Sequence, residues 1–338
     1  MAGQAFLPVV GDPSHAAGGE RDSGSRHAKL TRDASGIGLN GQILREYTQD
    51  DALWSRCGSH ENGLKPGGLS PDGLAGIAST LARELDIGGP ALTVSAACAS
   101  GLVALIRGVL MLRSGEASRV LVVAAESSFH PLLLASYRRL GVLSDPTTGC
   151  RPFDRGRRGF FVGEAAAAVM LETTPTEAFS HCPGTPGERC SVDAFALGSD
   201  AISITASDPS GQVLGRLIQR VSRGRGFDLV HAHGTGTDRN DPVELSAIDS
   251  AFSEPTPVYS HKGALGHTLG ASGLVSVVLN CLAHGRGLIP PNSRTPNPLS
   301  SRCAIISETP LSRPIRRSLV IATGFGGPVA VVALGRDR

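Results

Sequence analysis

The sequence predicts an α/β protein built from two similar halves. Short apolar segments with strand character alternate with longer apolar helical segments over most of the 338 residues. The five residues Ala-Ser-Gly-Leu-Val at 99–103 recur at 271–275, and each copy opens an apolar helix a few residues after a strand. A similar strand follows each helix, RVLVVAAE in the first half and SLVIATGF in the second. This matching context favours a duplication over chance. Helices of small residues packed between the halves predict a layered core with strands buried on both faces.

Composition and charge restrict the class of protein. Hydrophobic residues make up 41% and charged residues 18%, and 32 basic against 30 acidic residues give a net charge of +2. This balance excludes disorder and gives no excess charge to attract nucleic acid or an anionic membrane. The seven cysteines include no CxxC pair and predict free thiols in a reducing compartment. No apolar run is long enough to span a bilayer, so we expect a cytoplasmic protein.

The first half is expected to begin after a loose arm at residues 1–33, which are rich in Gly, Ser and Ala, and to extend over residues 34–175. Its apolar periodicity predicts two helices, and its β-rich runs predict three strands. The helices cover residues 70–85 and 101–114, and the strands cover residues 91–95, 119–125 and 165–172.

The second half is expected to cover residues 176–338 and to repeat the theme of the first. The predicted strands cover residues 228–232, 258–260 and 319–323, and the predicted helix covers residues 271–284.

Cys98 is the first candidate for chemistry. It lies in Val-Ser-Ala-Ala-Cys-Ala-Ser-Gly, where a strand ends and a buried helix begins. A thiol at the positive end of a helix dipole is expected to have a lowered pKa, and small neighbours permit a tight turn and a close substrate. This is the setting of a nucleophile on an elbow, although a buried structural cysteine explains the residue type equally well.

His233 is the second candidate. It follows a strand and opens the loop His-Gly-Thr-Gly-Thr, which places it at the carboxyl edge of a sheet, where α/β proteins build sites. A histidine satisfied at a strand end is an equal alternative. A zinc site that pairs His231 with His233 is less favoured, because alternate residues of a strand point to opposite faces.

Lys262 and His267 form the third candidate group. Lys262 is one of only three lysines, and it lies five residues before His267 in glycine-rich sequence that opens the repeated helix. A desolvated lysine can hold a neighbouring carboxylate or imidazole in place, and Asp241 and Glu244 are candidate partners. For His261 we expect a surface position.

Of two glycine-rich segments, only one is a candidate for a functional site. The loop Gly-Phe-Gly-Gly at 324–327 follows the last long strand, and its backbone N–H groups could stabilise an oxyanion. The segment at 36–41 matches GxGxxG but follows no convincing strand, so it predicts no dinucleotide site.

Together these segments resemble the β-ketoacyl synthases, the condensing enzymes of fatty-acid and polyketide assembly within the thiolase-like superfamily. The resemblance rests on SAACASG around Cys98, AHGTGT around His233, SHKGALGHTLGASG around Lys262 and His267, and GFGG around Phe325. The motifs stand in the family's order and extend over about residues 35 to 335. The resemblance implies a thiolase-like fold of duplicated α/β halves in five α-β-α-β-α layers, and a discrete type II kind of synthase.

The resemblance also implies the roles of the residues. Cys98 would accept an acyl chain from an acyl carrier protein, and a malonyl carrier would then lose CO2 and attack the thioester in a decarboxylative Claisen condensation. His233 and His267 would stabilise the enolate, and Lys262, paired with Glu244, would orient them. The N–H groups of Cys98 and Phe325 would form the oxyanion hole, with the Phe325 ring as a gate. No metal and no cofactor is implied, because the carrier's phosphopantetheine delivers both substrates.

Alternatives remain open at this point. The family carries a first strand and helix before the nucleophile that the loose arm replaces here, which motivates a non-elongating partner subunit of the chain-length-factor type. A homodimer, or a heterodimer with a ketosynthase-like subunit, is expected. A metal- or nucleotide-binding module is the least favoured function. Acyl chain length, and the choice between fatty acid and polyketide, are not predicted.

Overall fold

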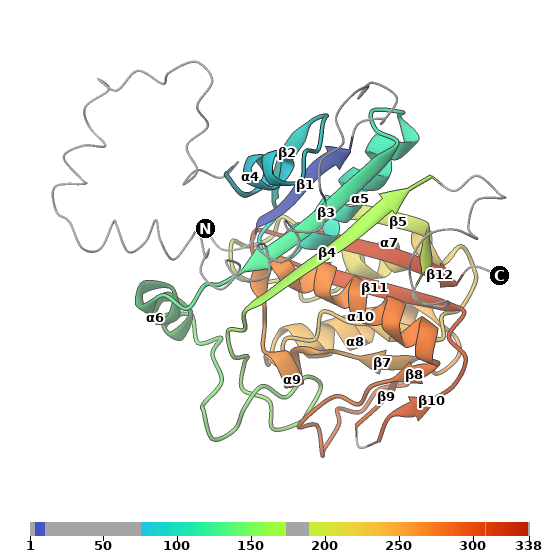
Figure 1. The fold of residues 1–338 in the computed structure, drawn as a ribbon. Helices are drawn as coiled ribbons and strands as arrows, with labels where there is room; N and C mark the ends of the chain where they lie inside the picture. Colours follow the sequence, from blue (N-terminus) through green and yellow to red (C-terminus); the bar gives the residue numbers. More distant parts are fainter. Residues whose placement is uncertain (1–3, 11–75, 174–188, 308, 337–338) are drawn as a thin grey trace, which may run out of the picture.

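The computed structural model describes residues 4–10, 76–173, 189–307 and 309–336 (Figure 1). They form two main sheets and a small pair of strands. The first sheet has the order β2-β1-β3-β4, and each strand is antiparallel to its neighbours. Its strands are β1 (Gln4–Val10), β2 (Ala91–Ser95), β3 (Arg119–Glu126) and β4 (Ala165–Glu172).

The second sheet is mixed and has the order β5-β12-β11-β6-β7-β9. The strands from β11 to β9 are parallel, and β12 is antiparallel to both β11 and β5. The strands are β5 (Cys190–Ser199), β6 (Leu229–His231), β7 (Pro257–Tyr259), β9 (Ala304–Ile305), β11 (Arg317–Thr323) and β12 (Pro328–Arg336). Strands β8 (Leu288–Ile289) and β10 (Leu311–Ser312) form the separate pair.

Helices α5 (Ser100–Arg113) and α10 (Ser272–Arg286) lie between the two sheets, and α7 (Gln212–Ser222) and α8 (Asn240–Ala251) pack on the other face of the second sheet (Figure 1). The remaining helices are α4 (Gly76–Glu84), which packs against β1 and β2, α6 (Pro131–Arg139), α9 (Lys262–Leu265) and the 3-10 turn η2 (Leu269–Ala271). None of the helices in the described ranges has the length and apolar character to cross a membrane.

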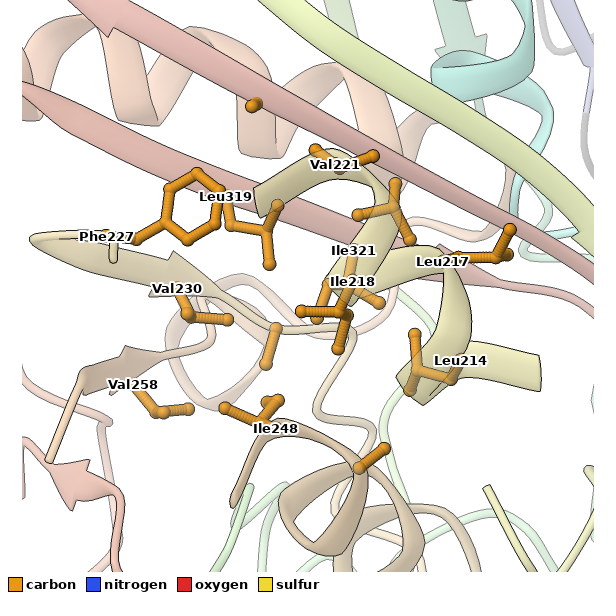
Figure 2. Close-up of a cluster of buried hydrophobic side chains, with 14 of the residues drawn as sticks. Leu214, Leu217, Ile218, Val221, Phe227, Val230, Ile248, Val258, Leu319 and Ile321 are labelled. Carbon is orange, nitrogen blue, oxygen red and sulfur yellow. The ribbon is translucent and has the colours of Figure 1, made fainter. Parts of the chain in front are cut away.

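Hydrophobic patterning explains these layers. Along β3 the residues at 120, 122 and 124 are fully buried against the central helices, and the alternate residues are partly exposed. Helix α7 packs on β5 and β12 and buries Leu214, Leu217, Ile218 and Val221, which recur at the spacing of one helical face. These side chains share one apolar cluster with Val230 of β6 and with Leu319 and Ile321 of β11 (Figure 2). Strand β11 is buried along nearly its whole length because helices cover both of its faces.

The predicted duplication is present in the fold. In each half a strand leads to a central helix, and two antiparallel strands follow, as β2-α5-β3-β4 and as β7-α10-β11-β12. Among the strands that correspond in the two halves, one differs in direction. Strand β6 lies between β7 and β11 and is parallel to both, whereas β1 lies between β2 and β3 and is antiparallel to both.

The prediction of a loose arm is therefore wrong for Gln4–Val10, which form β1. An apolar run of this length is sufficient for a strand, and the polar composition of the following residues concealed it. The rest of the arm, the GxGxxG segment at 36–41, the start of the helix predicted at 70–85 and the predicted boundary at 175–176 lie outside the described residues.

The two copies of the repeated sequence meet where α5 and α10 cross. A Cβ on Gly101 would lie 2.9 Å from the backbone nitrogen of Leu274 and 3.0 Å from the carbonyl of Gly270. Reciprocally, a Cβ on Gly273 would lie 2.9 Å from both the nitrogen and the Cβ of Leu102. Contacts this short leave no room for a side chain, so the close helix crossing depends on glycine in both copies.

We therefore predict that Gly101→Ala lowers the free energy of unfolding by about 1–3 kcal/mol, because the added methyl forces the helices apart. Alanine favours a helix by about 1 kcal/mol over glycine, so helix propensity alone would raise the free energy of unfolding. A decrease must therefore come from the steric clash. Gly88→Ala is the matched control, because a Cβ there has no neighbour within 4 Å. Urea denaturation measures both, and equal midpoints for the two variants would contradict the crossing.

Candidate active site

A cavity of about 290 Å³ brings together four of the residues predicted to act: Cys98, His233, His267 and Phe325. The lining contains both apolar and polar residues. The apolar ones include Tyr137, Leu140, Val142, Phe160 and Leu269, and the polar ones include Thr205, Ser207, Thr237, Asp238, Arg239 and Asn240.

Cys98 stands on the predicted elbow between β2 and α5. Ala97 has φ of +48°, which is uncommon for a residue with a side chain and marks a sharp turn. The Ser100 hydroxyl fixes this turn, because it accepts from the Ala96 N–H at 2.8 Å and donates to the Ala97 carbonyl at 2.6 Å. The half-buried thiol is thereby held at the cavity, one residue before the cap of α5.

The expectation that the pKa of Cys98 is lowered is wrong. Burial raises the pKa of the thiol to about 12, Glu126 acts in the same direction, and Lys262 opposes them. Desolvation in an apolar cavity outweighs the dipole of the helix. The resting group is therefore a protonated thiol, which must lose its proton as it reacts.

Glu244 and Asp241 from the first turns of α8 hold the loop that carries His233. The Glu244 carboxylate accepts from the His233 N–H at 2.6 Å, from the Gly234 N–H at 2.8 Å and from Asn240 Nδ2 at 3.1 Å. Asp241 accepts from Gly236 N–H at 3.1 Å. These bonds satisfy two buried carboxylates and fix the loop.

Lys262 holds the other side of the same residue. Its ammonium is 1% exposed and donates to the His233 carbonyl. The expected pairing with Glu244 is indirect, because no ion pair joins these two side chains among the described residues. Burial lowers the pKa of Lys262 to about 8 and raises that of Glu244 to about 7, and each charge offsets part of the other's shift. Together they clamp the N–H and the carbonyl of His233.

His267 is held by its backbone. Its N–H donates to the Phe161 carbonyl at 2.6 Å, and its carbonyl accepts from the Gly163 N–H at 2.9 Å. The ring lies 5.3 Å from the His233 ring and 4.9 Å from the Phe160 ring, close to perpendicular to both. Its Nδ1 makes no hydrogen bond to any described residue. Burial and the Lys262 charge hold the pKa of both histidines well below the usual value, so both rings are neutral.

The Gly-Phe-Gly-Gly loop packs directly on the elbow. A Cβ on Gly324 would lie 2.8 Å from the Ala96 carbonyl, so glycine permits the approach. The Gly326 N–H donates to the Ile204 carbonyl at 2.8 Å. The N–H groups of Cys98 and Phe325 donate to no acceptor of good geometry within the described ranges, which leaves both available to a ligand in the cavity.

Two further sequence expectations have opposite outcomes. His231 does not share the cavity with His233, as the strand alternation predicted, and it contacts Asn280 and His261 instead. The expectation of a surface position for His261 is wrong, because the residue is fully buried. A group of three or more potential metal ligands is absent from the part of the chain that the structure describes.

Sequence reasoning missed the aromatic wall of the cavity. Tyr137 belongs to α6, which was not predicted, and no role was predicted for Phe160. The amphipathic composition of Pro131–Arg139 was the available signal for α6.

Comparison with known proteins adds to this geometry. The family model of the Beta-ketoacyl synthase, N-terminal domain, matches residues 18–177, and that of the C-terminal domain matches residues 189–295. The 3-oxoacyl-acyl-carrier-protein synthase 2 of Mycobacterium bovis is 31% identical over 273 residues, which are 77% of this chain and 64% of the relative. The chain thus spans about two thirds of the length of that relative.

Solved structures show the same fold. The ishigamide ketosynthase/chain length factor superposes with a TM-score of 0.74 at 25% identity, over 88% of this chain and 72% of its own. A type II polyketide synthase acyl-carrier protein in complex with its ketosynthase gives a TM-score of 0.72 at 24% identity, over 79% of this chain and 69% of its own.

The chain belongs to the β-ketoacyl synthase family, a family of condensing acyltransferases. The resemblance drawn from the motifs and the expected thiolase-like α/β fold are both confirmed.

The buried histidines predict a fold that loses stability in acid. When the pH falls below 6.5, the unfolded chain protonates these histidines and the folded protein does not, so the free energy of unfolding decreases. Asp241 and Glu244, with pKa values raised to about 6 and about 7, act in the opposite direction, but they are two groups against five. The five are His231, His233, His261, His267 and His284.

We expect the urea midpoint to fall steadily between pH 6.5 and about 4.5. His231→Asn removes one of the five imidazoles, so its midpoint should depend less steeply on pH. A wild-type midpoint that stays constant or rises over this range would contradict the neutral buried rings.

Proposed function

We propose that this protein is a β-ketoacyl-acyl-carrier-protein synthase. The proposal rests on one observation. Cys98, His233 and His267 line the same cavity, and Lys262 and Glu244 together hold the backbone of His233. A nucleophilic thiol supplies the acyl acceptor, and two neutral imidazoles supply hydrogen-bond donors where negative charge develops.

In the first step Cys98 Sγ attacks the carbonyl of an acyl thioester on an acyl carrier protein. A new thioester bond forms at Sγ, the bond from the acyl carbon to the carrier sulfur breaks, and the carrier leaves as a thiol with the Cys98 proton. The N–H groups of Cys98 and Phe325 are suited to bind the oxyanion of the tetrahedral intermediate, because neither donates to a described acceptor.

In the second step a malonyl carrier loses CO2, and the electron pair of the broken bond forms an enolate. The enolate carbon attacks the carbonyl of the Cys98 thioester and a carbon–carbon bond forms. The bond from the acyl carbon to Sγ then breaks, and the released thiolate takes up one proton from solvent. His233 and His267 are suited to stabilise the enolate oxygen, since a neutral imidazole donates a hydrogen bond without a fixed charge. The chemistry needs no metal and no further cofactor, because the carrier's phosphopantetheine holds both substrates.

The apolar and polar residues of the cavity lining suit the two parts of such a substrate. Tyr137, Phe160 and Leu269 offer apolar surface to an acyl chain, with the Phe325 ring as the gate beside Cys98. Thr205, Thr237 and the other polar residues offer hydroxyl and amide partners to the phosphopantetheine arm. We place the reaction in the cytoplasm, which the free thiols of Cys98, Cys150, Cys281 and Cys303 support. The active form is proposed to be a homodimer or a heterodimer with a ketosynthase-like subunit.

Intact-protein mass spectrometry after incubation with acyl carriers of several chain lengths tests the proposal. We expect the wild type to gain the mass of one acyl group and Cys98→Ala to gain none. Cys150→Ala is the matched control, because Cys150 is buried in the same apolar cluster but does not line the cavity. It should acylate as the wild type does.

A folded wild type that gains no acyl mass would overturn the proposal. It would then favour the non-elongating partner subunit, which stable binding to a second ketosynthase-like chain would identify. Acyl mass on Cys98→Ala, or its loss on Cys150→Ala alone, would assign the nucleophile elsewhere.

A further inference from the structure

A row of buried polar side chains lies behind the cavity and takes no part in the chemistry above. Ser272, Ser276, Asn280 and His284 recur at intervals of four residues and therefore share one face of α10. All four are at most 2% exposed, although α10 lies between two apolar sheets. Burial of polar groups is costly unless each finds a partner, and an apolar face would serve packing equally well.

The partners of this face come from the segments that carry the site. His231 Nδ1 lies 2.7 Å from Asn280 Oδ1, and His231 Nε2 lies 2.9 Å from His261 Nδ1. His261 Nε2 lies 3.4 Å from the Ser272 hydroxyl, and the Ser276 hydroxyl lies 3.4 Å from His261 Nδ1. The two histidines thus join β6, the turn before α9 and the start of α10.

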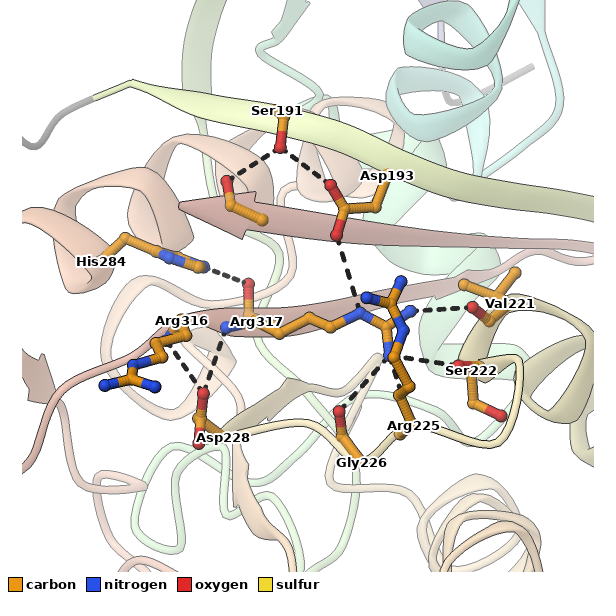
Figure 3. A network of polar contacts seen from close by, with 12 residues as sticks. Ser191, Asp193, Val221, Ser222, Arg225, Gly226, Asp228, His284, Arg316 and Arg317 are labelled. Carbon is orange, nitrogen blue, oxygen red and sulfur yellow. Dashed lines mark hydrogen bonds and ion pairs between the residues drawn. The ribbon is translucent and has the colours of Figure 1, made fainter. Parts of the chain in front are cut away.

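The other end of the row reaches β11. Asn280 Nδ2 donates to the Ser318 hydroxyl at 3.1 Å, and that hydroxyl lies 2.8 Å from His284 Nε2. His284 stands at the edge of the polar network around Arg317 and Asp228 (Figure 3). The row therefore extends from Ser272 at the start of α10 to Ser318 near the start of β11.

The hydrogen bonds define one direction of donation. The Asn280 carbonyl oxygen accepts from His231, so His231 carries its hydrogen on Nδ1 and accepts at Nε2. His261 must then donate from Nδ1 and accept at Nε2 from Ser272. At the far end Asn280 Nδ2 donates to the Ser318 hydroxyl, which lies 2.8 Å from His284 Nε2.

Three members stand within five residues of a site residue in the sequence. His231 is two residues before His233, His261 is one residue before Lys262, and Ser272 is five residues after His267. Ser318 belongs to β11, the strand that leads to the loop of Phe325. The contact between Lys262 and His233 joins the segment of His231 and His233 to the segment of His261 and Lys262. The contact between His261 and His231 joins the same two segments a second time, behind the cavity.

We propose that His231 and His261 are positioning residues, whose one-way chain of hydrogen bonds holds the segments of His233, Lys262 and His267 at a fixed spacing. This inference rests on the proposed condensing activity. The three segments serve the malonyl step, whereas Cys98 stands on α5, which contributes no member to the chain. Loss of the chain should therefore impair condensation much more than acyl transfer to Cys98.

His261→Phe tests the inference, because it keeps a planar ring of similar shape and leaves His231 Nε2 without its donor. The unsatisfied buried nitrogen should shift the segment that carries His233, so condensation by the acylated protein should fall about tenfold or more. The rate of acylation of Cys98 should change little. His261→Asn replaces Nδ1–H with an amide N–H in a similar place and should restore most of the condensation rate.

Tyr259→Phe is the matched control. Tyr259 packs on the His231 ring with centroids 4.8 Å apart, but its hydroxyl is outside the chain. It should leave the ratio of the two half-reactions unchanged. Equal loss of both half-reactions in His261→Phe, or no loss in either, would overturn the positioning role.

Nitrogen-15 NMR of histidine-labelled wild-type protein tests the chain without any activity. We expect neutral rings with the hydrogen on Nδ1 for both His231 and His261, assigned with the single variants. An Nε2–H tautomer at either residue would overturn the one-way chain. A wild type that shows these tautomers but never acylates Cys98 would contradict the proposed function. The chain of hydrogen bonds would then be confirmed, but it would have no role in condensation.

Discussion

The crossing of α5 and α10 at Gly101 and Gly273 is the constraint on which the rest of the structure depends. At each glycine the backbone of the other segment comes so close that a side chain would not fit. Both helices are covered by a sheet on each side, so they cannot separate without opening the central core. Because Cys98 precedes one helix and His267 precedes the other, this single contact sets where the thiol and the imidazole meet.

The second half of the chain adds buried charges and hydrogen bonds that hold His233 in place, which the helix crossing alone would not do. Glu244 and Lys262 clamp the two ends of the His233 peptide, and both charges are buried deeply enough to shift each other's pKa. Such groups cost stability and are retained where they fix geometry. The polar face of α10 adds further buried hydrogen bonds behind the cavity, so the histidine side of the site rests on more hydrogen bonds than the thiol side, where the Ser100 hydroxyl holds the turn.

Much of the fold and site could be predicted from local sequence. The repeat at 99–103 and 271–275 identified both central helices, and strands such as β2 and β11 were found within two residues. The motifs also identified all four residues that meet in the cavity. The misses have physical causes. The raised Cys98 pKa and the burial of His261 depend on what covers each residue from distant segments, which local pattern does not report. Strand β1 and helix α7 did carry apolar signals, at Phe6–Val10 and at the regular spacing from Leu214 to Val221.

The most direct test of the account is the condensation rate of Gly273→Ala, measured per folded molecule at a temperature where circular dichroism shows the variant to be native. A Cβ at this position would press on Leu102, in the helix that follows Cys98. The account predicts that the folded variant condenses more slowly than the wild type, because the thiol and the histidine pair no longer meet at the same spacing. A folded variant with the wild-type rate would contradict the claim that the helix crossing sets the geometry of the site.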